Sequence, residues 1–423
     1  MTMTDTDIQT AILDMGRKAR AASRELVKLS SEQKNAILRA MADGIMARET
    51  AILEANAKDL ANAESNGLSN AMIDRLMLNS KRLAAVAQAV REVADLPDPV
   101  GEVLAEWTRP NGLRIVKKRV PIGVIGIIFE SRPNVTTDAA SLCFKTSNVT
   151  ILRGGSEAIH SNNALAVALQ EGGATAGLPA NSVQLVPFTD RSSVDHMARM
   201  DQFIDLIIPR GGKGLIEKVV STARMPVIKH YDGVCHVYVH ADADLEMAAN
   251  IVVNSKCQKP GVCNALETLL VHRGVAAAFY PLLGKRLREA GVEMRGDAEA
   301  LAHLPDAKAA TDEDWTTEYL DLILSMKTVS GVDEAIDHIN AFGSHHTESI
   351  ITRDEATALH FMHNIDSAVV LWNASTRFND GGEFGFGAEI GISTDKLHAR
   401  GPMGLAELTS YKYLVFGAGQ TRK

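Results

Sequence analysis

The chain has 423 residues, of which 46 % are hydrophobic and only 5 % aromatic, and its formal net charge is −8. This length provides for two or three domains with separate cores, and the many Ala and Gly residues are typical of a helix-rich α/β enzyme. The negative charge is not offset by any run of basic residues, which argues against a nucleic-acid-binding surface.

The cellular setting follows from the cysteines and from the apolar runs. Four cysteines, Cys143, Cys235, Cys257 and Cys263, are too few for a disulfide framework in so long a chain and indicate a reducing compartment. Residues 1–8 are polar and do not resemble a signal peptide, and no apolar run is long enough to span a bilayer. We therefore expect a soluble, cytoplasmic protein without membrane contacts.

Residues 8–95 are predicted to be helical almost throughout. Apolar residues recur at spacings of three and four, as in Leu83, Val86, Val90 and Val93. This region carries no chemical motif and is expected to be scaffold, ending at Pro97 and Pro99.

Residues 103–120 predict a β-hairpin. Asn111-Gly112 supplies the turn, and short arms over 103–107 and 113–116 flank it. A lone hairpin is not stable in water, so this one must pack against another part of the chain or another subunit. The predicted strand Thr409–Phe416 is a candidate partner. We interpret the hairpin as an oligomerisation arm.

From Pro121 the pattern becomes strand, loop and helix in repetition, which predicts a parallel, doubly wound sheet. The expected strands are 122–129, 149–152, 183–186 and 203–208. Ligands bind such sheets at the carboxyl ends of the strands. Two ends carry the same tripeptide, Arg153-Gly154-Gly155 and Arg210-Gly211-Gly212, in which glycine admits an anion to the backbone and arginine adds charge. These tripeptides are either nucleotide phosphate sites or plain turns; neither is a Walker loop or a Gly-x-Gly-x-x-Gly fingerprint.

A second α/β region follows residue 230. We expect strands over 234–239, 320–326 and a buried one over 368–372, with helices over 245–256, 276–290 and 352–364. Cys263 follows a Pro-Gly loop between the helix 245–256 and an apolar stretch. It is either a nucleophile that the loop exposes or a small buried residue. The glycine-rich segment 379–391, with interleaved phenylalanines, is expected to be an ordered loop that covers a site.

No metal is expected. The chain contains no His-Glu-x-x-His and no Cys-x-x-Cys, and the pairs His345-His346 and His360/His363 are interpreted as surface or helix-face residues.

Four motifs together resemble the gamma-glutamyl phosphate reductases, a branch of the aldehyde dehydrogenase superfamily. The motifs are Val120–Gly126, Ser131–Asn134, Gly261–Asn264 and Glu383–Thr394, the last continuing into Leu397–Gly404. The likeness runs from about Ile8 to Gly417. It implies an aldehyde dehydrogenase-like α/β fold: a Rossmann-type NADP-binding domain (1–99 and 117–229), a catalytic domain (230–396) and an oligomerisation arm (100–116 and 397–423). The implied reaction is the NADPH-dependent reduction of L-glutamate 5-phosphate to L-glutamate 5-semialdehyde and phosphate in proline biosynthesis.

The resemblance also implies roles for single residues. Cys263 matches the nucleophile and Asn134 the amide that stabilises the oxyanion. The cofactor contacts would be Arg153, Gly154, Gly155, Glu157, Arg210, Gly211, Gly212 and Glu318, with Glu318 on the nicotinamide ribose. The anionic acyl phosphate substrate needs cations, for which the family-like loops offer Arg132, Arg377, Lys396, His398 and Arg400. A homo-oligomer through the hairpin and C-terminal strand, and the upstream glutamate 5-kinase, are the expected protein partners.

One departure from the superfamily bears on the reaction. Oxidising members carry a glutamate that activates water to hydrolyse the thioester, and here that position is His230, in Lys229-His230-Tyr231-Asp232-Gly233. The replacement fits a reductase whose acyl-enzyme is released by phosphate, although His230 can serve as a weaker base. Two alternatives stay open: a hydrolytic NAD(P)-dependent semialdehyde dehydrogenase, and a non-catalytic nucleotide-binding protein with the same fold.

Overall fold

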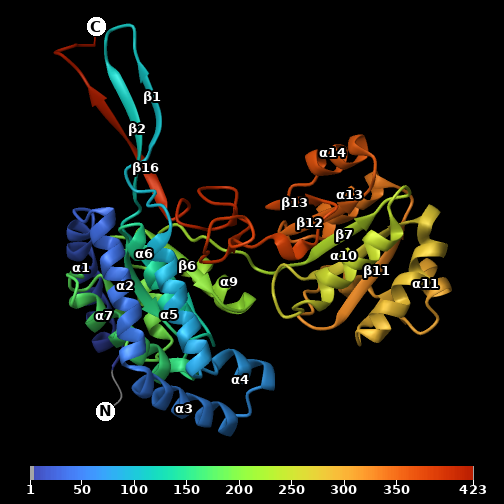
Figure 1. The fold of residues 1–423 in the computed structure, drawn as a ribbon, viewed down its shortest axis with the longest axis horizontal. Helices are drawn as coiled ribbons and strands as arrows, with labels where there is room; N and C mark the ends of the chain where they lie inside the picture. The colour runs from blue at the N-terminus through green and yellow to red at the C-terminus, as the bar shows by residue number, and fades with distance from the viewer. Residues whose placement is uncertain (1–3, 423) are drawn as a thin grey trace. The chain divides into compact units, whose positions relative to one another are not determined.

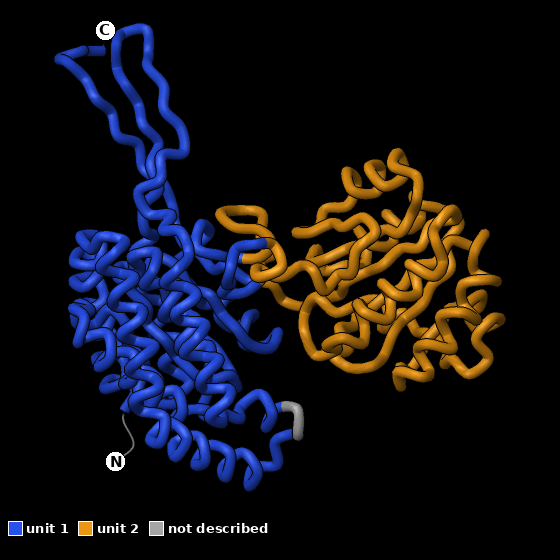
Figure 2. The backbone as a smooth tube through the Cα atoms, viewed as in Figure 1, with its two compact units in different colours: residues 1–229, 385–391, 403–423 blue, residues 230–384, 392–402 orange. Residues whose placement is uncertain are grey.

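The computed structural model describes residues 4–422, which fold into two compact units (Figure 2). Residues 1–229, 385–391 and 403–423 form unit 1, and residues 230–384 and 392–402 form unit 2. Assignment of cofactor, catalytic and arm roles to the predicted domain boundaries stays a prediction.

Unit 1 begins with the predicted run of helices. These are α1 (Asp5–Leu26), α2 (Ser31–Ala47), α3 (Glu49–Ser65), α4 (Asn70–Leu76) and α5 (Ser80–Asp95). Helices α1 and α2 each start at a capping box, in which the hydroxyl of Thr4 or Ser30 accepts the N–H three residues on. Such boxes satisfy two amide groups that would otherwise lack partners, which is why the helices begin there.

The parallel sheet of unit 1 contains β3 (Val124–Phe129), β4 (Val149–Arg153), β5 (Val183–Leu185) and β6 (Leu206–Arg210), in the order β5-β4-β3-β6. Helical segments alternate with these strands: α6 (Asn134–Lys145), η1 (Ser156–Ala158), α7 (Ile159–Ala174), α8 (Ser192–Ala198) and α9 (Lys213–Thr222). The strand expected over 203–208 begins later, because the N–H groups of Phe203 and Ile204 both donate to Met200 O in a turn. The α/β fold with parallel sheets is confirmed.

The hairpin is joined by the C-terminal strand, as predicted. Strands β1 (Val103–Thr108), β2 (Arg114–Pro121) and β16 (Thr409–Phe416) form an antiparallel sheet in the order β1-β2-β16. Figure 1 shows this sheet, hereafter the arm, extending beyond the helices of unit 1. Every residue of β1 is exposed, and its use in oligomerisation stays a prediction.

Unit 2 is built on a seven-stranded parallel sheet in the order β10-β9-β11-β8-β7-β12-β13. The strands are β7 (Cys235–Val239), β8 (Leu266–His272), β9 (Glu293–Gly296), β10 (Lys308–Ala309), β11 (Ile323–Val329), β12 (Thr347–Ile351) and β13 (Val369–Trp372). The helical segments are α10 (Leu245–Cys257), α11 (Arg273–Glu289), α12 (Ala298–His303), η2 (Asp312–Thr316), α13 (Val332–Phe342), α14 (Glu355–Asn364) and η3 (Thr376–Phe378). A short ladder, β14 (Ile392–Ser393) with β15 (Gly401–Pro402), completes the unit.

Three predictions for unit 2 need correction. The strand expected over 320–326 runs from Ile323 to Val329. The helix expected from Thr352 begins at Glu355, because Asp242 binds the Thr352 hydroxyl and the Arg353 N–H and holds both outside the helix. Strand β13 is half-buried rather than buried, since it is the edge strand. Among residues 4–422, no helix combines the length and apolar character needed to cross a membrane.

Candidate active site

The phosphate-site candidates of unit 1 converge on one edge of its sheet. Strands β3, β4 and β6 are parallel neighbours, so their carboxyl ends, near Glu130, Arg153 and Arg210, lie on the same side. The strand order reverses between β3 and β6, and such a switch point is where open α/β sheets bind ligands. At that point the Glu130 carboxylate accepts the N–H of Gly212 at 2.9 Å. The sheet thus places an anion-accepting backbone where sequence analysis expected it.

Glycine is required in these turns by close packing. A β-carbon on Gly211 would overlap the Glu130 carboxylate, and one on Gly155 would overlap the Glu157 carboxylate. Gly212 differs: it starts α9 without a side-chain cap, and a β-carbon there would meet nothing within 4 Å. The start of α9 therefore suits an anion, because helix N-termini present N–H groups and a positive dipole end, and in this structure the Glu130 carboxylate takes that place by accepting the Gly212 N–H.

Arg153 and Glu157 are engaged within unit 1. Arg153 is 8 % exposed, its guanidinium donates to Thr189 O at 2.8 Å and to Gly154 O at 3.1 Å, and burial lowers its pKa. Glu157 accepts from the hydroxyl of Ser131 at 2.9 Å and also from its N–H. The hydrogen bonds between Ser131 and Glu157 join the loop that follows β3 to the one that follows β4. Both side chains therefore stiffen the sheet edge, and their contact with a cofactor stays a prediction.

Asn134 is the first residue of α6 and lies at the same edge. Its amide donates to the Asp138 carboxylate at 2.8 Å. Burial raises the pKa of Asp138 to about 6, and the positive charge of Arg210 opposes that rise. This hydrogen bond to Asp138 fixes the orientation of the Asn134 side-chain amide. The second N–H proton of that amide therefore points in a defined direction.

Cys263 of unit 2 lies half-buried in the turn between α10 and β8, as the Pro-Gly loop predicts. Its carbonyl oxygen accepts from the Cys235 thiol at 3.1 Å, and the neighbouring Asn264 amide donates to Asn379 O at 2.8 Å. A β-carbon on Gly233 would overlap the Cys263 backbone. The turn is therefore held from three sides, while Cys263 as a residue stays half-buried.

Two imidazoles lie beside this thiol. A ring nitrogen of His230, one of His346 and the Cys263 sulfur all lie within 4.8 Å of one another. His346 is fully buried, and its Nδ1 is 2.7 Å from Thr347 Oγ1. The prediction that His345-His346 lies on the surface is wrong for His346. The error has a physical reason, since residue 346 immediately precedes a wholly buried strand whose neighbours cover it.

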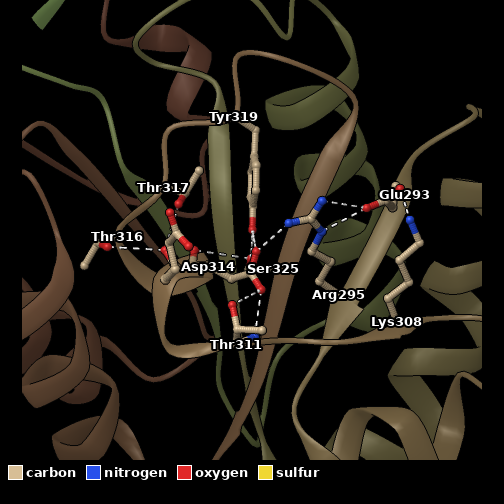
Figure 3. Close-up of polar contacts among 10 residues, drawn as sticks. Glu293, Arg295, Lys308, Thr311, Asp314, Thr316, Thr317, Tyr319 and Ser325 are labelled. Carbon is tan, nitrogen blue, oxygen red and sulfur yellow. Dashed lines mark hydrogen bonds and ion pairs between the residues drawn. The ribbon is translucent and has the colours of Figure 1, made fainter.

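Glu318 also lies near Gly233. Its carboxylate accepts the Gly233 N–H, and burial raises its pKa. Its neighbour Tyr319 is clamped: the hydroxyl lies 2.6 Å from Asp314 Oδ1 and 2.6 Å from Ser325 Oγ (Figure 3). Arg295 continues the network by donating to Asp314 at 2.6 Å. This network positions the segment that carries Glu318.

The parallel sheet explains why these residues meet. His230 and Gly233 precede β7, Cys263 precedes β8, Glu318 precedes β11 and His346 precedes β12. In unit 2 these candidate catalytic side chains therefore lie at the amino ends of the parallel strands. In unit 1 the candidate phosphate sites lie at the carboxyl ends of the strands. Of these residues, sequence analysis missed His346 as a site residue, because the strand that it precedes, Thr347-Glu348-Ser349-Ile350-Ile351, is mostly polar in sequence and gives no sign of burial.

Lys256 lies in the last turn of α10, seven residues before Cys263. It is fully buried, and its Nζ lies 2.6 Å from Glu267 Oε2. Burial raises the pKa of Glu267 to about 7. Because Lys256 is committed to this pair, it offers no uncompensated positive charge to Cys263.

The five candidate substrate cations fall into separate places. Arg377 donates to Gln258 Oε1 at 2.8 Å, which brings it to the start of the Cys263 turn. Lys396 and Arg400 both pair with Asp366, at 2.5 and 2.8 Å, and hold the pKa of Asp366 down at about 2. His398 is exposed with a positive φ of 72°, and Arg132 belongs to the loop after β3 in unit 1.

Comparison with known proteins agrees with this architecture. The profile of the Aldehyde dehydrogenase family matches residues 2–302. The gamma-glutamyl phosphate reductases of Paramagnetospirillum magneticum and Brucella suis are each 54 % identical, over 99 % and 98 % of this chain and 99 % of their own lengths. The crystal structure of gamma-glutamyl phosphate reductase from Thermotoga maritima has a TM-score of 0.95 at 46 % identity, covering 97 % of this chain and 100 % of that one. The chain is thus an oxidoreductase that belongs to the aldehyde dehydrogenase family, in its gamma-glutamyl phosphate reductase branch.

Proposed function

We propose that this chain reduces L-glutamate 5-phosphate to L-glutamate 5-semialdehyde and phosphate with NADPH, in proline biosynthesis, through a thioester on Cys263. The name and near-complete coverage of relatives at 54 % identity support the substrate. The observation that carries the mechanism is the placement of Cys263, a half-buried thiol on a turn that Gly233, Cys235 and Asn264 hold in position. A fixed, accessible thiol is what covalent acyl transfer needs.

In the first step the Cys263 thiolate attacks the carbonyl carbon of the acyl phosphate. A C–S bond forms, the C–O bond to phosphate breaks, and phosphate leaves with the electron pair. We assign Asn134 to the developing oxyanion; loss of one such donor typically lowers kcat by about 100- to 1000-fold. A smaller loss in Asn134→Ala, measured under saturating substrate, would remove this assignment.

The residues of unit 1 fit a dinucleotide. The start of α9 at Gly212 supports a phosphate site, because a β-carbon there would meet nothing within 4 Å and the Gly212 N–H already binds a carboxylate, that of Glu130, in this structure. We assign Arg153–Gly155, Glu157, Arg210–Gly212 and Glu318 to the cofactor. When bound, NADPH supplies the hydride that takes the acyl group to the aldehyde level.

The competing function is hydrolytic oxidation of the semialdehyde. His230 stands where oxidising relatives have their water-activating glutamate, and its Nδ1 lies 2.8 Å from Ile392 O. That hydrogen bond leaves Nε2 as the ring nitrogen of His230 that can accept a proton. The support for release by phosphate over release by water is that no carboxylate base stands at this position.

The deciding experiment is the reverse assay, in which semialdehyde oxidation with NADP⁺ is followed with and without inorganic phosphate. We expect turnover only with phosphate, and weaker turnover with NAD⁺. Cys263→Ser should abolish it, while Cys257→Ser, at the other half-buried thiol of unit 2, should not. Turnover that is independent of phosphate would replace the proposal by the hydrolytic function.

A further inference from the structure

Three metal-ligating atoms meet beside the candidate nucleophile. The Cys263 sulfur and one ring nitrogen each of His230 and His346 are within 4.8 Å of one another, and the two rings meet edge to face at 74° with a centroid distance of 5.3 Å. A thiolate with two imidazoles is a ligand set that Zn²⁺ favours over Mg²⁺ or Ca²⁺, which prefer oxygen.

His346 gives independent evidence for a ligand. Its ring is fully buried, its Nδ1 is engaged with Thr347 Oγ1, and its Nε2 has no hydrogen-bond partner among residues 4–422. Leaving a buried polar atom unpaired costs about 1–3 kcal/mol, and native structures rarely tolerate it without a function. A lone pair at Nε2 is the ordinary means by which imidazole binds a metal.

The protonation of His230 is fixed by its partner. A backbone carbonyl can only accept, so Nδ1, at 2.8 Å from Ile392 O, carries the proton and donates it. In the neutral imidazole, Nε2 is then the nitrogen that carries the lone pair. Metal-ligating histidines are commonly oriented in this manner, with one N–H donated to a carbonyl and the other nitrogen on the metal.

We propose that Cys263, His230 and His346 form a Zn²⁺ site that reversibly inhibits the enzyme. Zn–S and Zn–N bonds of about 2.3 and 2.0–2.1 Å place tetrahedral ligand atoms about 3.3–3.6 Å apart. The present separations therefore need only a modest contraction, which the half-buried Cys263 and His230 side chains can make while His346 stays fixed. On binding, the Cys263 S–H bond breaks, its proton goes to solvent, and the sulfur lone pair bonds the metal. The sulfur is then no longer a nucleophile.

Metal binding itself needs only the thiol and the imidazoles, whereas the inhibitory consequence rests on the proposed function. The two are separated by using Co²⁺ as a spectroscopic probe. Titration of the full chain with Co²⁺ should produce a thiolate-to-cobalt charge-transfer band that Zn²⁺ displaces and Mg²⁺ does not. A protein that shows this band but no reductase activity would retain the site and lose the proposed function.

Variants decide between this site and adventitious binding. Cys263→Ser should abolish the band, and His346→Gln should weaken Co²⁺ and Zn²⁺ affinity by at least about 10- to 100-fold. His230→Gln gives the same test if His346→Gln does not fold. The matched controls are Cys257→Ser and His345→Asn; His345 is exposed with a positive φ that Asn accepts. Both controls should bind as the unmodified chain does. A band that survives in Cys263→Ser, or equal affinities in both histidine variants and the unmodified chain, would overturn the proposal.

Discussion

The backbone of Gly233 lies so close to Cys263 that a β-carbon on residue 233 would overlap the Cys263 carbonyl oxygen. Gly233→Ala must therefore displace the Cys263 turn, and we expect kcat to fall by about 100-fold, the typical result of misplacing a reacting group by about 1 Å. The matched control is Gly331→Ala, because a β-carbon at Gly331 meets nothing within 4 Å. Steady-state kinetics with both purified variants test this; unchanged kcat in Gly233→Ala would show that the turn is not constrained.

Arg377 is the candidate substrate cation that the structure brings to the Cys263 turn, through Gln258. Because a hydrogen bond to a charged group contributes about 1.5–3 kcal/mol, Arg377→Ala should raise KM for the acyl phosphate by about 10- to 100-fold. Lys396→Ala provides the comparison, since Lys396 is 70 % exposed and paired with Asp366. We expect its KM to stay within about twofold. A rise confined to the Lys396 variant would reverse the assignment.

The ion pair of Lys256 and Glu267 is wholly buried, at 2.6 Å. Glu267→Gln leaves a buried ammonium without its counter-charge, and such changes cost about 3–5 kcal/mol. Equilibrium unfolding in urea measures the loss. Lys308→Ala is a control with the same geometry at the surface, where Lys308 lies 2.6 Å from Glu293 and is 66 % exposed; it should cost less than about 1 kcal/mol. Equal losses in the two variants would show that burial does not decide the effect.

His338 makes stability depend on pH. Burial lowers its pKa from 6.5 to about 3, with further contributions from His236 and Lys327. Below pH 6.5 His338 is therefore protonated in the unfolded chain but stays neutral in the folded chain. The free energy of unfolding consequently decreases as pH falls from about 6.5 towards 3. Between pH 7 and 5 this amounts to about 2 kcal/mol.

The test of this pH dependence compares His338→Phe with the unmodified chain. The variant should lose about 2 kcal/mol less than the unmodified chain between pH 7 and 5, measured by urea unfolding at each pH. His345→Asn removes an exposed histidine instead and should leave the slope unchanged. Parallel pH profiles for His338→Phe and the unmodified chain would contradict the assignment.

The arm exposes aromatic residues on both outer strands. Trp107 of β1 is 38 % exposed and Tyr413 of β16 is 53 % exposed, with ring centroids 6.2 Å apart. If the arm joins subunits, changing both residues to Ser should lower the assembled mass in sedimentation experiments, because exposed apolar sheet surface favours association. Leu359→Ser removes a similarly exposed apolar side chain from α14 and should leave the mass unchanged. An unaltered mass in the double variant would remove the arm from the interface.

Local patterns in the sequence were sufficient for the elements of this protein. The helical run over 8–95, the alternation that builds two parallel sheets, and the pairing of Thr409–Phe416 with the hairpin were all predicted and are confirmed. The helices and strands depend on periodicity, turn residues and caps, which act between residues close in the chain. The pairing of the C-terminal strand could be predicted because the exposed hairpin offered few alternative partners.

The tertiary structure alone decided which side chains meet. His346 lies beside Cys263 although 83 positions separate them. Glu267 and Glu348 are fully buried, which no local sequence pattern predicts for a glutamate. In a parallel sheet each strand enters from the same edge, so residues that precede separate strands converge only once the strand order β11-β8-β7-β12 is set. That order is a property of how the whole sheet packs, and a sequence read one segment at a time does not contain it.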